Sequence, residues 1–259
     1  GIPIDFHPKF KNKRALEIVL STLHAGGKFD NNSYKTSGGL HGVGISVVNA
    51  LSSFLEVNVH KNSKKYSQLY SKGKPKTKIK ITKCKKNEKG TEIIFSPDES
   101  IFETTQFSPK KLYDFIKMKA VLVSRTIIDF KIDKELISDN TPNYEKFHFK
   151  NGIADFLDIK NKNTAKLFDK QFSIIKNIND NEKCEIFISF NQNEKSSLIS
   201  FCNTIETPDG GSHENGFKNG ILKALKLYGQ KNQVSKISNI NINDLTDYSD
   251  IIISIFINE

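Results

Sequence analysis

The sequence has few cysteines, only two arginines, no tryptophan and no long apolar run, and these shortages exclude several classes of protein. Cys84, Cys184 and Cys202 have no metal-ligand spacing and do not form a disulfide framework. No run approaches the roughly 18 apolar residues of a membrane span, and the first residues lack a signal-peptide pattern. The 259 residues, 37% of them hydrophobic, are therefore expected to form a globular, cytoplasmic protein of two domains with no membrane partner.

The net charge of +10 comes almost entirely from lysine, because Arg14 and Arg125 are the only arginines. A basic chain can bind nucleic acid. Abundant lysine, asparagine and isoleucine together are also typical of a gene rich in A and T, which raises the lysine content without a nucleic-acid partner. Twelve lysines lie between Lys61 and Lys89. This segment can be a phosphate-backbone contact or a solvated hairpin, and the pattern favours the hairpin.

Hydrophobic periodicity predicts helices and strands in alternation over the first part of the chain. Apolar residues at Ala15, Ile18 and Val19 predict an amphipathic helix that ends by Gly26. A second helix is expected over the apolar run 43–51. Alternation at Leu55, Val57 and Val59 then predicts a strand with one buried face.

Further elements follow the same signals. Ser108 as N-cap and Pro109 at the first helical position predict a helix whose apolar face is Leu112, Phe115 and Ile116. A later helix has its expected face at Phe217, Ile221, Ala224, Leu225 and Tyr228. The remaining strands are expected at 66–70, 77–82, 91–95, 126–132, 147–149, 184–190, 198–203 and the C-terminal "DIIISIFINE". A turn cluster at 138–143 places a domain boundary near residue 145, which gives domains of 1–145 and 146–259.

The stretch "SGGLHGVGISVVNALS", residues 37–52, combines four glycines with the start of a helix. Glycine permits positive φ and close approach, and a helix N-terminus favours anions, so the pattern indicates a phosphate site. A tight helix–loop junction without a ligand is the alternative. The sequence has no P-loop motif, and a dinucleotide fingerprint is excluded because Val47 occupies the third glycine position.

Four motifs around this loop occur together and in order: "GIP" at 1–3, "LHAGGKF" at 23–29, "SYKTSGGLHGVG" at 33–44 and "KGTEIIF" at 89–95. With "SVVNALS" and "CNTIETPDGGSH", they make essentially the whole chain resemble the ATPase region of type IIA topoisomerase B subunits. "KMKAVLV" and "FCNTIETPDGGSHENG" look more like the topoisomerase IV branch than the gyrase branch.

This resemblance implies an α/β (α+β) fold. A GHKL-type ATPase domain, a two-layer sandwich, would be followed by a transducer domain like ribosomal S5 domain 2. It also implies an enzyme in which ATP and Mg²⁺ drive two B subunits to clamp as a homodimer around DNA. The partner A subunit, of topoisomerase IV or gyrase type, cuts and rejoins DNA. The expected location is the cytoplasm, in association with the nucleoid.

The resemblance also implies an ATP site. Gly1 and Ile2 would end the adenine-site motif, Val19 would line the adenine pocket, and Thr91 would help to hold the base. Lys28 and Tyr34 would lie in the lid over the nucleotide. The phosphate loop would consist of Leu40, His41, Gly42, Val43, Gly44 and Ile45, where His41 fixes the loop and the backbone N–H groups bind.

Departures from the family pattern lead to further expectations. Lys61 stands where many members have an arginine at the pocket mouth, and lysine lacks the planar fork. The family's catalytic glutamate and Mg²⁺-binding asparagine would precede Gly1, and its Gln-Thr-Lys loop would follow Glu259. No catalytic or metal residue is therefore expected within the chain, and the 259 residues alone are expected to be inactive. A degenerate GHKL-like binding module without ATPase activity and a MutL-like ATPase are the alternatives.

Overall fold

The structure is a computed structural model that describes residues 2–7, 10, 12–24, 42–179, 182–192 and 196–257. The chain divides into two compact units, Gly1–Gln106 and Phe107–Glu259, which are taken one at a time below. Within the described residues, no helix is both long and apolar enough to cross a membrane.

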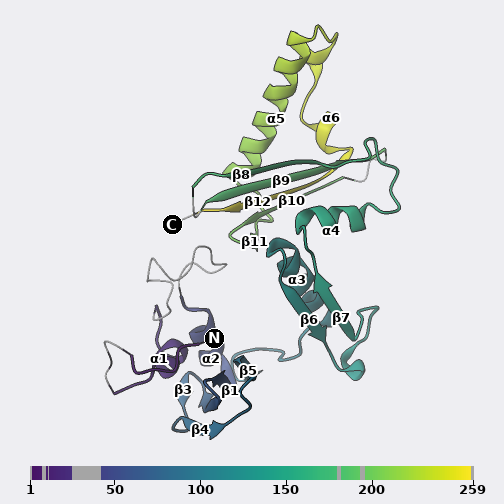
Figure 1. Ribbon diagram of the computed structural model, residues 1–259. Helices are drawn as coiled ribbons and strands as arrows, with labels where there is room; N and C mark the ends of the chain where they lie inside the picture. The colour runs from purple at the N-terminus through teal and green to yellow at the C-terminus, as the bar shows by residue number, and fades with distance from the viewer. Residues whose placement is uncertain are drawn as a thin grey trace. The chain divides into compact units, whose positions relative to one another are not determined.

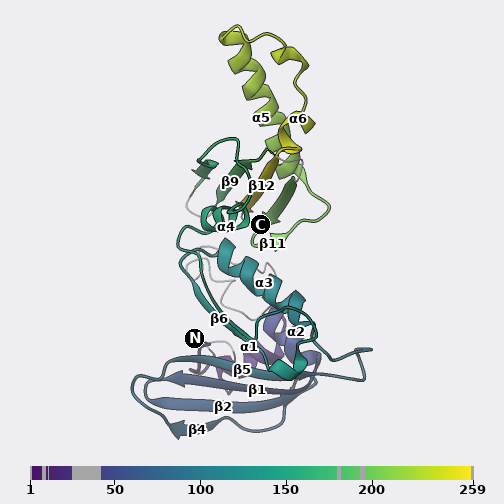
Figure 2. The same cartoon turned by 90° about the vertical axis from the view of Figure 1, so that its right-hand side faces the viewer.

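The first unit is built on a 5-stranded antiparallel sheet (Figure 2). The strand order is β3-β2-β1-β5, and β4 also pairs with β2. The strands are β1 (Ser52–Lys61), β2 (Lys64–Ser71), β3 (Lys74–Pro75), β4 (Lys80–Lys83) and β5 (Gly90–Pro97). The predicted lysine-rich hairpin is therefore real, and most of its lysines are exposed.

Two short helices, α1 (Ala15–Ser21) and α2 (Gly44–Ala50), pack against one face of this sheet. The predicted apolar face of β1 is confirmed, because Leu55, Val57 and Val59 are at most 1% exposed. Asn58 on the opposite face is also buried, with hydrogen bonds to Glu92 and Ser67. The three apolar side chains of β1 form one hydrophobic cluster with Leu16 and Leu20 of α1 and with Ile4, Tyr66 and Tyr70. The unit is thus a two-layer sandwich of helices on a sheet.

The second unit contains a 5-stranded sheet of order β11-β10-β12-β9-β8 (Figure 1). The strands are β8 (Phe172–Asn177), β9 (Lys183–Phe190), β10 (Ser197–Cys202), β11 (Ile205–Glu206) and β12 (Ser249–Phe256). β10 and β12 are parallel, and the other pairs are antiparallel. A separate hairpin is formed by β6 (Ile127–Lys131) and β7 (Tyr144–His148).

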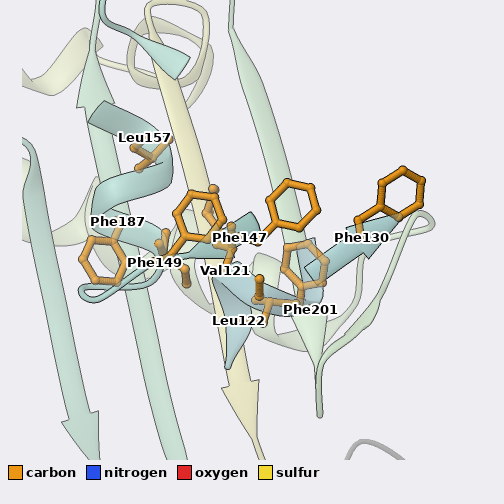
Figure 3. Close-up of a cluster of buried hydrophobic side chains, with 11 residues drawn as sticks. Val121, Leu122, Phe130, Phe147, Phe149, Leu157, Phe187 and Phe201 are labelled. Carbon is orange, nitrogen blue, oxygen red and sulfur yellow. The ribbon is translucent and has the colours of Figure 1, made fainter. Parts of the chain in front are cut away.

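Hydrophobic clusters cover both faces of this sheet. On one face lie α3 (Pro109–Leu122), α4 (Ile153–Lys160) and the β6–β7 hairpin, packed around Phe147, Phe187, Phe201 and Ile252 (Figure 3). On the other face, α5 (Ser212–Lys231) contributes Phe217 to a cluster with Ile251 and Ile253. The unit also contains α6 (Asn243–Thr246) and single 3-10 turns at Lys134–Leu136 and Ile237–Asn239.

Several details differ from the sequence-based expectations. Ser108 caps α3 as predicted, since its Oγ accepts the Lys111 N–H. Phe115 and Tyr228, however, are 60% and 65% exposed, and Ala224 is exposed too, so these three assignments to apolar helix faces are wrong. α3, β6 and β7 belong to the second compact unit, because their side chains contribute to its hydrophobic core. The boundary near residue 145 stays a prediction about the ATPase and transducer domains.

Candidate functional site

The first contact at the candidate site joins the start of the chain to β5. The backbone N–H of Ile2 donates to Oγ1 of Thr91 at 3.2 Å. Thr91 lies opposite Val59 in the β1–β5 register, near the beginning of β5. Ile2 also packs against the hydrophobic cluster of the first unit, so the "IPI" segment is fixed beside the sheet.

The described end of the glycine loop has the geometry that the sequence predicts. Gly42 has φ 59, a left-handed conformation in which other residues are strained. A Cβ on Gly44 would meet nothing within 4 Å, so packing inside the protein does not require glycine there. The first backbone bond of α2 runs from Val47 N–H to the Val43 carbonyl at 2.9 Å, and the N–H groups of Gly44 and Ile45 precede it.

Asn49 fixes this helix within the unit. Its side chain is fully buried, and Nδ2 donates to the Leu20 carbonyl in the last turn of α1 at 2.9 Å. The backbone carbonyl of Asn49 accepts a hydrogen bond from the Gly73 N–H at 3.0 Å. Because α1 carries the half-buried Val19, the Asn49 amide links the predicted pocket wall to the helix that follows the glycine loop.

Charged groups near the Ile2–Thr91 contact are already paired. Lys61 lies 3.4 Å from Asp5, and Glu92 accepts a hydrogen bond from Asn58 Nδ2 at 2.8 Å. Lys61 is therefore at the same edge of the sheet as the "IPI" segment. These ion pairs and hydrogen bonds set the electrostatics of the described part of the site.

The structure brings together part of the predicted residue set. Ile2 and Thr91 are in contact, and Ile2 and Ile45 pack against the same hydrophobic cluster. Val19 lies on α1, which packs against α2. Gly1, Lys28, Tyr34, Leu40 and His41 lie outside the described residues.

Sequence reasoning did not assign a role to Arg14 or Asn49. Asn49 had a signal, because it is a polar residue within the apolar helical run "SVVNALS". Arg14 is one of two arginines in a lysine-rich chain, but its partners are distant in sequence. Among the residues that the structure describes, no group of three or more His, Cys, Asp or Glu side chains could hold a metal ion.

Comparison with known proteins identifies the relatives of this chain. The model of the DNA gyrase B family matches residues 152–259. The B subunit of DNA topoisomerase 4 from Rickettsia felis is 45% identical over 100% of this chain and 39% of its own length. The B subunit of DNA gyrase from Thermotoga maritima is 38% identical over 99% of this chain and 40% of its own length. The chain thus spans about two fifths of the length of these curated relatives.

Solved structures agree with the sequence relatives. The topoisomerase IV ATP-binding domain of Francisella tularensis, solved with a small-molecule inhibitor, has a TM-score of 0.72 and 30% identity, covering 100% of this chain and 66% of that one. The 43K ATPase domain of Thermus thermophilus gyrase B, solved with an aminocoumarin, has a TM-score of 0.75 and 27% identity, covering 100% and 65%. The expected mixed α/β fold of a GHKL-type ATPase region is confirmed. The chain belongs to the family of type IIA DNA topoisomerase B subunits.

Proposed function

We propose that this chain is the ATP-binding part of a type II DNA topoisomerase B subunit, of the topoisomerase IV type rather than the gyrase type. The high identity to topoisomerase IV proteins supports that choice, because the Rickettsia felis protein is 45% identical and the Thermotoga maritima gyrase protein 38%. In the whole protein, ATP hydrolysis would couple the clamping of two B subunits to DNA strand passage.

The observation that carries this proposal is the Ile2–Thr91 hydrogen bond. It places two residues of the expected adenine site, far apart in sequence, against each other. Val19 would form the adjoining apolar wall. The backbone at Gly42, Val43, Gly44 and Ile45 would approach the phosphates, as the positive φ of Gly42 permits. Gly1, Lys28, Tyr34, Leu40 and His41 complete the proposed nucleotide site.

Among the described residues, no group of three or more His, Cys, Asp or Glu side chains could hold a metal ion by itself. Mg²⁺ that binds with ATP would take most of its ligands from the phosphates and water. Mg²⁺ enters the proposal only through the family, as a companion of ATP. Water attack on the γ-phosphate also needs a positioned base. Asp5 and Glu92 are the carboxylates near the Ile2–Thr91 contact, and they interact with Lys61 and Asn58. We expect the 259 residues assayed alone to release no phosphate.

The proposed partners are DNA, a topoisomerase A subunit and a second B subunit, and the proposed location is the cytoplasm at the nucleoid. The test is decatenation of interlinked DNA circles by the full-length protein mixed with its A subunit. Decatenation should require both ATP and the A subunit, and a non-hydrolysable ATP analogue should not support repeated turnover. Full-length protein that binds no ATP would instead favour the degenerate binding module.

A further inference from the structure

Arg14 makes an unusual set of contacts immediately before α1. Its backbone is extended, with φ −79 and ψ 149, and forms an isolated antiparallel bridge with Phe6. The side chain turns back, so that Nη1 donates to the Ile4 carbonyl at 2.9 Å. The guanidinium carbon lies 4.7 Å from the ring centre of Phe6 and 5.9 Å from that of Tyr66.

The segment that Arg14 holds is neither helix nor ladder strand. Ile4 is only 4% exposed, and a buried carbonyl without a donor costs free energy, so the charged donor from Arg14 stabilises this backbone. The Ala15 N–H adds a second bond to the Asp5 carbonyl at 2.8 Å. A flat guanidinium can donate to Ile4 while it lies over aromatic rings, and a lysine ammonium cannot stack in this way.

We propose that Arg14 is a positioning residue for recognition of the nucleotide base. The inference rests on the proposed function and deepens it. Ile4 is two residues from Ile2, so the Arg14 bond fixes the direction in which Ile2 reaches Thr91. Arg14 thereby acts on the base-binding end of the site through the backbone. It takes no part in hydrolysis at the phosphates.

The chain offers a matched control for charge. Lys13 is the neighbouring cation, and its Nζ lies 3.3 Å from Glu17 on α1. Its side chain is 55% exposed. Lys13→Gln removes the same positive charge as Arg14→Ala, one residue away, without touching the Ile4 carbonyl. Arg14→Lys keeps the charge and a donor but loses the planar stack.

The experiment measures KM and kcat for ATP, and the KM ratio of GTP to ATP, in full-length protein with its A subunit. Arg14→Ala should raise KM for ATP about tenfold, the scale of one hydrogen bond to a charged group, with kcat within about twofold. The ratio of KM for GTP to KM for ATP should fall in Arg14→Ala. Arg14→Lys should lie between Arg14→Ala and the wild type, and Lys13→Gln should match the wild type.

Other outcomes overturn the inference. A lower kcat with unchanged KM in both Arg14 variants would mean that Arg14 only keeps more of the protein folded. An equal rise of KM in Lys13→Gln would assign the effect to charge alone. If Arg14→Ala does not fold, Arg14→Lys decides, and wild-type KM in that variant counts against the stacked geometry. Wild-type protein without ATP turnover would refute the proposed function itself, and this inference with it.

Discussion

Strand β1 of the first unit and strand β12 of the second are both central strands, but their sequences differ in pattern. In β1, the apolar Leu55, Val57 and Val59 alternate with polar positions, because the described helices of this unit pack on one face of the sheet. In β12, Ile251, Ile252 and Ile253 are all buried, with neighbours packed on alternating faces. Alternating apolar residues therefore indicate a strand whose sheet is covered on one face. A continuous apolar run indicates a strand whose sheet is covered on both faces.

Each unit buries neutral amides and a carboxylate that is paired with a lysine. The first unit buries Asn49, Gln68 and the carboxylate of Asp98, which lies 2.8 Å from Lys72 Nζ. The second buries the carboxylate of Asp250, which accepts hydrogen bonds from Lys160 Nζ at 2.6 Å and from Asn191 Nδ2 at 2.9 Å. Burial alone would raise the pKa of Asp250, but hydrogen bonds from Lys160 and Ser197 and the Lys160 charge lower it. The second sheet thus depends on an ion pair that ties α4 to β12.

The largest expected effects come from the two faces of β12. Ile251→Ala and Ile252→Ala should each lower the free energy of unfolding by about 4 kcal/mol, because each leaves a cavity in a different core. In β1, Phe54 points outward and is 40% exposed, so Phe54→Ala should lower the free energy of unfolding by about 1 kcal/mol. Urea unfolding of the four proteins, wild type included, measures these values. A near-zero cost for either isoleucine would show that one face of β12 is not covered.

Asp250→Ala should cost about 3 kcal/mol at neutral pH, because it leaves the Lys160 ammonium without its carboxylate. The pKa of Asp250 is lower in the folded state than its ordinary value of 3.8. The stabilisation is therefore fully present above the unfolded pKa and is lost as pH falls through the folded pKa. Unfolding free energies between about pH 2 and pH 7 should fall less steeply in the variant than in the wild type. Parallel curves would contradict this assignment.

Sequence-based predictions were right where the signal depends on neighbouring residues, and they failed where it depends on residues far apart in the chain. The cap of α3 at Ser108 and the apolar face of β1 depend on neighbouring residues, and both are confirmed. Phe115 and Tyr228 fit helical periodicity, but periodicity does not say how much of a helix face is covered. β8 was not predicted, although it contains Phe172, Ile174 and Ile175, and all its residues are exposed. Arg14 was not predicted because its contacts bring residues 4, 6 and 66 together.

A smaller effect is expected at Asn49 in the first unit. Asn49→Ala removes the donor to the Leu20 carbonyl and should cost about 2 kcal/mol, since that carbonyl is then buried without its partner. Asn58→Ala is a matched control, because Asn58 is equally buried but bonds only to side chains of the sheet. Hydrogen exchange should show α1 losing protection in Asn49→Ala only. Equal loss in both variants would remove the specific link between α1 and α2.

The smallest effect is expected for the lysine-rich hairpin. Changing Lys64, Lys65, Lys85 and Lys86 together to glutamine should leave DNA-stimulated ATPase activity of the full-length protein within about twofold. Lys64, Lys85 and Lys86 are exposed and Lys65 is half-buried, as expected of a mostly solvated face. A large loss of DNA affinity with a flatter salt dependence would instead identify the hairpin as a DNA contact.

The central claim is that the first unit binds ATP where Ile2 meets Thr91. Thr91→Val keeps the shape of the side chain but removes the hydroxyl that accepts the Ile2 N–H. Thr82→Val, on exposed β4, is the matched control. Calorimetric titration of full-length protein with a non-hydrolysable ATP analogue should show about tenfold weaker binding for Thr91→Val and unchanged binding for Thr82→Val. Wild-type affinity in Thr91→Val would contradict the account.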